Sequence, residues 1–248
     1  MMASQTLAEK FVELKKSKET PQNSRPKIQR VVDHLRNRNN FEKHYTPKCV
    51  SIGPIHHDNP NLKTGEKYKL MWASKYIENT GFIPEELHKK ISDNIDELKG
   101  RFSDDVLTLT EKSLEGFSSL EEKLSWMLFV DGCSLLYILE EPKLRDLRVY
   151  YIKPDQLVLV MMDVLLLENQ LPYEVLKLLW KDNNESELIK IMTNFLSDIP
   201  DESQSKKEKE GKGEHSVSIP NESPSETPTH LLEIQHKITL TKSNSKVQ

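Results

Sequence analysis

The sequence has few of the features that mark secreted and membrane-spanning proteins. Its 248 residues include only two cysteines, Cys49 and Cys133, too few for a disulfide framework and without a metal-binding spacing. Two unpaired cysteines fit a reducing compartment, and the alternative is a single disulfide bond between them. The longest apolar run, residues 157–167, is far shorter than the roughly 20 residues that cross a bilayer, and the N-terminus lacks the apolar stretch of a secretory signal. We therefore expect a cytoplasmic chain without a transmembrane segment.

Catalytic signatures and a strong overall charge are also missing. The sequence contains no glycine-rich phosphate loop, nucleophile elbow, zinc-protease helix or kinase motif. The net charge of -4 and the pI of about 6.1 give no overall reason to bind nucleic acid. We therefore predict no enzyme, no catalytic residue, no cofactor and no nucleic-acid partner.

Helical patterns dominate what is present. Residues 62–78 have the spacing of a helix that ends at Gly81, and residues 84–98 predict one amphipathic helix that stops at Gly100. A capping signature at 118–122 precedes a long apolar run, and residues 186–196 predict a further helix. Alternation typical of a strand is confined to 48–52. The predicted fold is mainly α, an irregular helical bundle.

The segment 154–180 is apolar on nearly all sides, which is typical of a helix at the centre of a bundle. Pro172 interrupts it, because proline removes one backbone donor and clashes with the preceding turn. We expect the helix to kink or stop near Gln170 and to restart at Pro172. The polar residues Glu168, Asn169 and Gln170 stand where this break frees backbone groups.

Composition divides the chain into four parts. Residues 1–26 are predicted to be a flexible N-terminal segment and 27–199 a helical domain. Residues 200–229 are rich in Ser, Glu, Lys and Pro and are predicted to be a disordered polar linker. Residues 230–248 are predicted to form a short helix and tail, with apolar residues whose packing partners are missing from this chain.

Three separated blocks, at 45–69, 126–139 and 163–176, resemble a plant-specific group, the domain of unknown function 247 family, also called UPF0481 proteins. The first contains Val-Ser-Ile-Gly-Pro and His-His, the second Asp-Gly-Cys, and the third Leu-Glu-Asn-Gln-Leu-Pro. Most of residues 28–180 are covered by the resemblance. The residues that carry it are Ser51, Gly53, Pro54, His56, His57, Glu66, Lys69, Asp131, Gly132, Cys133, Asp163, Leu167, Glu168, Asn169, Gln170 and Pro172.

The resemblance implies a function in recognition and a longer protein. Family members usually have a second half and a C-terminal membrane anchor, which places them at the plasma membrane, so this chain is expected to be truncated after the N-terminal half. Some members resemble determinants of self-incompatibility in grasses. Such a role requires protein partners and binding without turnover. Val32, Gly65, Ser134 and Glu174 depart from the family pattern, and each departure is expected to soften a packing site.

His56, His57 and Glu66 are the candidates for a metal site. Imidazole and carboxylate groups suit zinc and other transition metals, so the alternative function is a metal-assisted hydrolase that uses these three residues. However, adjacent histidines seldom point the same way, and no second spaced pair supplies further ligands. The competing interpretation is a loop after the Gly53-Pro54 turn, with histidines bonded to backbone or packed on the next helix.

Asp163 and Glu168 could line a polar pocket, since carboxylates in an apolar setting have shifted pKa values. Their spacing places them on different sides of a helix, which favours a structural network that holds the broken helices. Asp131 and Cys133 are interpreted in the same way. Cys133 would be a reactive thiol only beside a positive group that lowered its pKa, and its apolar flanks predict the reverse.

Residues 25–48 are locally basic. A third hypothesis is that these residues contact nucleic acid or anionic lipid. The simpler interpretation is a solvated basic surface. The residues concerned are Lys27, Arg30, Arg36, Arg38, Lys43 and Lys48.

Overall fold

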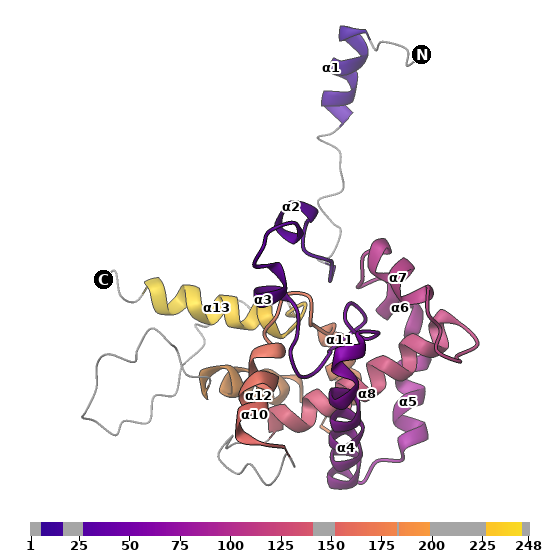
Figure 1. Cartoon of the computed structure of the whole chain (residues 1–248), viewed down its shortest axis with the longest axis vertical. Coiled ribbons are helices and arrows are strands. Elements are labelled where there is room, and N and C mark those ends of the chain that lie inside the picture. The colour runs from indigo at the N-terminus through magenta and orange to yellow at the C-terminus, as the bar shows by residue number, and fades with distance from the viewer. Residues whose placement is uncertain (1–5, 17–26, 141–151, 183, 199–226, 245–248) are drawn as a thin grey trace.

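A computed structural model shows a helical protein (Figure 1). The structure describes residues 6–16, 27–140, 152–182, 184–198 and 227–244. Within these ranges the chain forms helices and no sheet, and an isolated parallel bridge joins Ile28 to Phe102. The prediction of a mainly α fold is therefore confirmed.

Three short helices precede the main body of the domain. They are α1 (Leu7–Lys16), α2 (Asp33–Arg36) and α3 (Phe41–Tyr45). Every residue of α1 is exposed, and Figure 1 shows this helix standing apart from the others. The predicted flexible segment 1–26 otherwise lies outside the described residues.

The next helices follow the predicted stops, with one exception. A short 3-10 turn, η2 (Pro60–Leu62), leads into α4 (Lys63–Thr80), and Gly81 ends α4 with a left-handed φ of 70°. The single helix predicted over 84–98 is wrong, because α5 (Pro84–Ser92) and α6 (Ile95–Lys99) are separate. The Asn94 amide donates to the Lys90 carbonyl at 2.9 Å and so competes with the helical backbone.

The central helix is α8 (Leu120–Glu140), which follows α7 (Asp104–Glu111). Its start carries the predicted cap, since the Glu122 N–H donates to Ser119 Oγ at 3.2 Å. In Figure 1, α8 runs between α5, α6 and α7 on one side and α10, α12 and α13 on the other. Although α8 is long and largely apolar, neither it nor any other helix within the described ranges has the length and hydropathy of a membrane span.

The segment 154–180 is therefore not the centre of the bundle, and its break is wider than predicted. It forms α10 (Pro154–Asp163) and α11 (Tyr173–Leu179), so the first helix stops at Asp163 rather than near Gln170. The second helix begins directly after Pro172, as predicted. The intervening residues 164–172 form an irregular loop.

The last two helices pack on each other. They are α12 (Glu185–Asp198) and α13 (Leu231–Asn244). The prediction that the C-terminal helix lacks partners is wrong: its Leu231, Ile234 and Ile238 are buried, and it contacts α12. Most of the predicted linker 200–229 lies outside the described residues, but at its end the Thr229 carbonyl accepts from the Tyr173 N–H at 2.8 Å.

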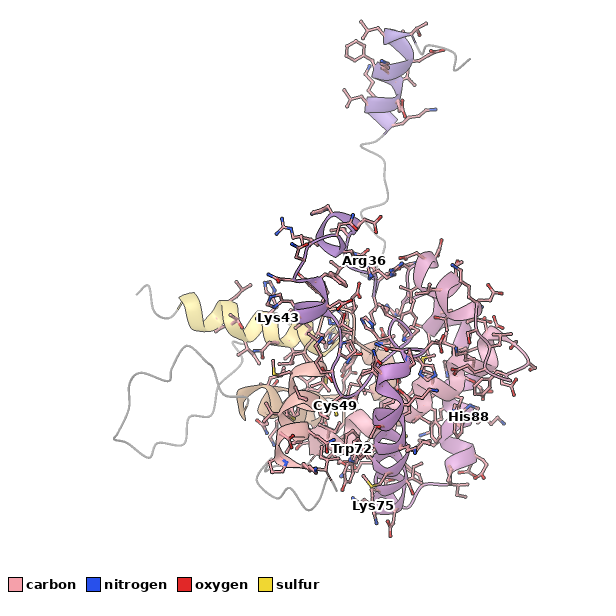
Figure 2. The ribbon with its side chains drawn as sticks, in the orientation of Figure 1. Arg36, Lys43, Cys49, Trp72, Lys75 and His88 are labelled. Atoms are coloured by element: carbon pink, nitrogen blue, oxygen red, sulfur yellow. The ribbon has the colours of Figure 1, made fainter. Side chains whose placement is uncertain are left out.

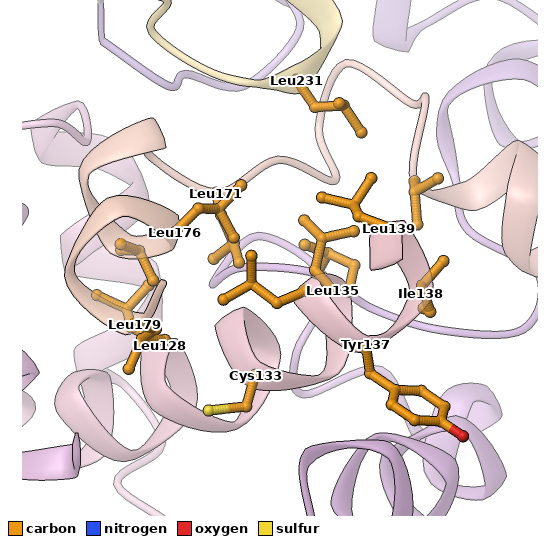
Figure 3. Packing of buried hydrophobic residues seen from close by; sticks show 14 of the residues in the cluster. Leu128, Cys133, Leu135, Tyr137, Ile138, Leu139, Leu171, Leu176, Leu179 and Leu231 are labelled. Atoms are coloured by element: carbon orange, nitrogen blue, oxygen red, sulfur yellow. The ribbon is translucent and has the colours of Figure 1, made fainter. Parts of the chain in front are cut away.

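The core surrounds α8, which packs most extensively on α4 and also contacts α5 and α11. Figure 3 shows leucine side chains of α8 and α11 in this cluster, with Leu171 and Leu231 beside them. A Cβ at Gly132 would lie 2.9 Å from Cγ1 of Val175 and still closer to the Leu179 side chain. A glycine inside α8 therefore permits the close packing that its presence in an apolar helix suggests.

Candidate functional site

The first motif block contains a segment without regular secondary structure, residues 48–53, whose backbone bonds to side chains instead of to a strand. The carboxylate of Asp163 accepts the N–H groups of Lys48, Cys49 and Val50 at 2.9, 2.6 and 2.9 Å. Burial raises the pKa of Asp163, and these three donors act against that rise. The last residue of α10 therefore anchors a segment that lies more than a hundred residues earlier in the chain.

Two further side chains continue this pairing. The Ile52 N–H donates to Asn169 Oδ1 at 2.6 Å, and the Gly53 N–H donates to Asp131 Oδ2 at 2.7 Å. Asn169 also donates from Nδ2 to the Val50 carbonyl at 3.1 Å. Side chains of the second and third motif blocks thus take the place of a neighbouring strand, which explains why the alternating pattern at 48–52 forms no sheet.

Two glycines allow this segment to lie close to its neighbours. Gly53 has a φ of 77°, and a Cβ there would lie 2.5 Å from the Gln170 carbonyl oxygen. A Cβ at Gly65 would overlap the Cys49 carbonyl oxygen. The departure from the family pattern at Gly65 therefore brings α4 close to the segment instead of loosening the contact.

Gln170 holds the loop and the C-terminal helix together. Its Nε2 donates to the Val164 and Leu166 carbonyls, both at 2.9 Å, so it satisfies backbone groups of the loop that follows α10. Its Oε1 accepts the Leu232 N–H at 3.2 Å. The amide explains how α13 is fixed to the third motif block.

Glu168 forms a second buried anchor. Its Oε1 accepts the Val31 N–H at 2.6 Å and pairs with the Arg36 guanidinium, while its Oε2 lies 3.1 Å from His56 Nε2. Burial acts to raise the pKa of Glu168, but the contacts with His56, the Val31 N–H and Arg36 hold it below its usual value. Glu168 is therefore an ionised structural group that fixes residues 31–36 to the loop.

A fully buried lysine connects α4 to α8. Lys69 Nζ lies 2.5 Å from Asp131 Oδ1, 2.9 Å from Glu66 Oε1 and 3.3 Å from Ser51 Oγ. Burial raises the pKa of Asp131, and the charge of Lys69 opposes this rise. Removing Lys69 would leave the buried carboxyl group of Asp131 without its counter-charge.

His57 continues this chain of charges toward the surface. Its Nδ1 lies 3.9 Å from Glu66, and its Nε2 lies 3.5 Å from Glu115. The buried Lys123 Nζ lies 2.9 Å from Asp58 and 3.9 Å from Glu115. Basic and acidic groups alternate from the buried Asp131 to Asp58 at the surface, which is an arrangement that lowers the cost of burying Lys69 and Lys123.

The three metal candidates do not form one ligand set. His56 turns to Glu168, whereas His57 faces Glu66 and Glu115, so the adjacent rings diverge. Within the described ranges, the group of three that could hold a metal ion is instead His57, Asp58 and Glu115, with ligand atoms within 4.8 Å of one another. The Lys123 ammonium group lies against two of these carboxylates and would compete with a metal for them.

Neither cysteine has the environment of a nucleophile. Both are free thiols, and Cys133 is buried. Burial raises the pKa of Cys133, and burial together with the charge of Asp163 raises the pKa of Cys49 to about 11. Both thiols are therefore protonated near neutral pH, as the apolar flanks of Cys133 predict.

Several motif residues are brought together around residues 48–57, whereas Gly132 packs against α11. Pro54 and Pro172 are buried, and Pro172 is the residue before the first turn of α11. Leu167 is instead 46% exposed. Sequence reasoning missed Lys123 and Glu115, which lie outside the recognised motifs. The sequence did signal a turn at Glu115, because a glycine follows it. Glu115 lies in this turn with a φ of 50°.

Comparison with known proteins agrees with the resemblance that the motif residues carry. A family model for DUF247, described as a plant protein of unknown function, matches residues 28–248. The chain belongs to the DUF247 family. It is 28% identical over 177 residues to UPF0481 protein At3g47200 of Arabidopsis thaliana, and this match covers 67% of the chain and 34% of the relative. The chain thus spans about a third of the length of that DUF247 relative. No solved structure matches it.

Two other departures from the DUF247 pattern are filled by polar contacts. Glu174 forms an ion pair with Arg101 at 2.5 Å. The buried Ser134 hydroxyl donates to the Asp131 carbonyl at 3.0 Å. At both positions a polar side chain with a bonding partner is therefore present, and the expectation that these departures soften packing stays a prediction.

Proposed function

We propose that this chain is a non-catalytic, protein-binding member of the DUF247 family that contacts its partner through an apolar surface of α10. This surface, the α10 face, consists of Val158, Leu159 and Met162. Their exposed fractions are 59%, 36% and 58%. Met162 lies four residues after Val158 and three after Leu159, so both side chains are its neighbours on the helix surface.

The α10 face is the observation that carries the proposal. A helix that is apolar on all sides is normally enclosed by other elements. Within α10, Leu157, Val160 and Met161 are buried in the domain, but the opposite side is left in contact with water. Apolar surface that is contiguous and exposed is typical of protein interaction sites, because burying it there is favourable.

The polar motif residues support the non-catalytic part of the proposal. A general acid or base must reach the proton it transfers on a substrate. The carboxylate of Asp163 is instead occupied by three backbone donors, and that of Asp131 by Lys69 and Gly53. These groups hold backbone in place and present no free oxygen to a substrate.

The finer role that we propose is recognition in signalling at the cell surface, of the type that self-incompatibility requires. Recognition depends on a surface of fixed shape, and the buried side chains around residues 48–57 hold one. The chain spans about a third of its Arabidopsis relative. The proposed role and the partner of the α10 face therefore concern the described region and not the whole length of that relative.

A paired comparison of variants tests the proposal. The double variant Val158→Ser, Met162→Gln removes the α10 face, and Leu70→Gln is the matched control because Leu70 is 51% exposed on α4. Proximity labelling in plant cells would identify partners, and calorimetry with each purified partner would measure affinity. We expect the double variant to weaken binding by at least about tenfold and the control to leave it unchanged.

Two results would contradict the proposal. The first is a partner that binds the wild type and the double variant with equal affinity. The second is stoichiometric zinc or manganese in the purified protein that is lost in His57→Ala, which would support the metal-assisted hydrolase instead. A dimer of the wild type that the double variant abolishes, measured by sedimentation, would show that a second copy covers the α10 face.

A further inference from the structure

A hollow of about 300 Å³ lies at the α2 and α3 end of the domain, away from the α10 face. Its apolar wall consists of Leu35, Phe41 and Tyr45. Figure 2 shows Arg36 and Lys43 in this part of the chain, above Cys49. The hollow is thus formed by a segment that the resemblance to DUF247 leaves without a role.

The apolar wall is held in a fixed position. The rings of Phe41 and Tyr45 stack with centroids 5.0 Å apart and planes at 16°. The Arg36 guanidinium lies 5.0 Å from the Phe41 centroid, and the same group pairs with the buried Glu168. Because the Arg36 guanidinium contacts both the Phe41 ring and Glu168, it connects the apolar wall to the third motif block.

The polar rim of the hollow contains one arginine, Arg38, without a counter-charge among the described residues. Arg38 and His44 line it and form no ion pair with any of the described residues. Two other basic residues of this segment are engaged, Arg36 by Glu168 and Lys48 by the Glu42 carbonyl at 2.7 Å. Arg38 thus places a cation beside the stacked rings, which suits an acidic ligand with an apolar group.

We infer that this hollow binds an acidic peptide segment of a protein partner, with one aromatic side chain against Phe41 and carboxylates facing Arg38 and His44. The volume is at the lower end of the range for ligand pockets and fits a single ring. Arg38, with Asn39 and Asn40 beside it, is exposed, so the ligand is a protruding side chain rather than an enclosed small molecule. Arginine and aromatic residues are the groups enriched where protein interfaces are strongest.

A protein partner is favoured over nucleic acid by the distribution of charge. Phosphate backbones are bound by rows of free Lys and Arg side chains. Here Arg36 pairs with the buried Glu168, Lys48 bonds to the Glu42 carbonyl at the surface, and the whole chain has a net charge of -4. The inference concerns a different surface from the α10 face and does not depend on the proposed function.

Fluorescence anisotropy with a labelled peptide, Glu-Glu-Phe-Glu-Glu, tests the inference on the full chain. Two matched peptides separate the parts of the ligand: Gln-Gln-Phe-Gln-Gln lacks the charge and Glu-Glu-Ala-Glu-Glu lacks the ring. We expect each to bind at least about tenfold more weakly than the first peptide. A competition with single-stranded oligonucleotide measures the alternative ligand.

Variants of the protein then locate the site. Arg38→Gln and Phe41→Ala are each expected to weaken the peptide by about tenfold, while Lys43→Gln removes the same charge outside the hollow and changes affinity by no more than about twofold. Phe41→Leu, which keeps an apolar side chain, shows whether a loss in Phe41→Ala reflects the ring. Thermal melting confirms that each variant is folded.

Four outcomes would overturn the inference. They are absence of peptide binding up to about 1 mM, equal binding of the peptide without the ring, equal loss in Arg38→Gln and Lys43→Gln, and tighter binding of the oligonucleotide with the same dependence on Arg38. Chemical-shift changes of the wild type confined to residues 35–45 on addition of the peptide would support it.

Discussion

Two neighbouring stretches of this protein reverse the usual relation between polarity and burial. In α10, Val158 and Met162 are 59% and 58% exposed. In the loop that follows, Glu168, Asn169 and Gln170 are 1%, 1% and 2% exposed. The apolar residues of the first stretch contact water, whereas the polar residues of the second are enclosed.

The reversal has a different cause in each stretch. The buried polar side chains bond to backbone groups that would otherwise be unsatisfied, so their burial is stabilising. The exposed side chains of the α10 face have no such bond to explain them, and their exposure costs solvation free energy until a partner covers them. The comparison separates residues that hold the fold from residues that are available for binding.

The largest expected effect is the loss of the Asp163 carboxylate. Asp163→Ala leaves three backbone donors of residues 48–50 buried without an acceptor, and we expect it to lower the free energy of unfolding by about 3–5 kcal/mol. Asp163→Asn keeps one acceptor oxygen and is expected to cost less. Urea unfolding of the three proteins measures this, and equal stability of Asp163→Ala and wild type would break the comparison.

Gly53→Ala tests how closely the first motif block approaches the loop. A Cβ at this position would lie 2.5 Å from the Gln170 carbonyl oxygen, and the φ of 77° is unfavourable for alanine. We expect a loss of about 2–3 kcal/mol by urea unfolding. Gly116→Ala is the matched control, since Gly116 also has a positive φ but no atom within 4 Å of its added Cβ. A cost no larger at Gly53 than at Gly116 would show that the close approach is absent.

The stabilisation by Glu168 depends on pH in a direction that its pKa determines. Because the folded protein lowers the pKa of Glu168, the ionised form contributes stability that is present above the unfolded pKa of about 4.3 and is lost as pH falls through the lower folded value. Glu168→Gln should therefore cost about 1.5–3 kcal/mol at neutral pH and less below about pH 4. Unfolding curves across this range measure the difference, and a constant difference would contradict the assignment.

The smallest effect on stability is expected at the α10 face. Val158→Ser with Met162→Gln should change the free energy of unfolding by less than about 0.5 kcal/mol per residue, because both side chains are exposed. Val160→Ala, on the buried side of the same helix, should cost about 1–3 kcal/mol. Thermal and urea unfolding compare them. A large loss in the double variant would mean that the α10 face packs inside the domain.

Glycine and proline residues in the sequence predict most helix ends. Gly81 after α4 and Pro172 before α11 end or begin helices for reasons that act within one turn. The end of α10 at Asp163 was not predictable in this way. The donors that the Asp163 carboxylate accepts are 113 to 115 residues away, and no local pattern contains them.

The candidate site shows the same division. Sequence motifs identified Asp163, Glu168 and Asn169 as members of a polar network, and their hydrogen bonds agree with that hypothesis. The directions of His56 and His57 depend on the fold of the loop, which placed one ring on Glu168 and the other between Glu66 and Glu115. Burial of Lys123 was also hidden, because its partners come from separate loops.

Amide hydrogen exchange of residues 48–53 tests most directly whether buried side chains replace a neighbouring strand. The account predicts slow exchange at Lys48, Cys49, Val50, Ile52 and Gly53 in the wild type, although within the described ranges no strand pairs with them. In Asp163→Asn, exchange at residues 48–50 should accelerate more than at Ile52 and Gly53. Fast exchange of all five amides in the wild type, or an equal acceleration of all five in the variant, would contradict it.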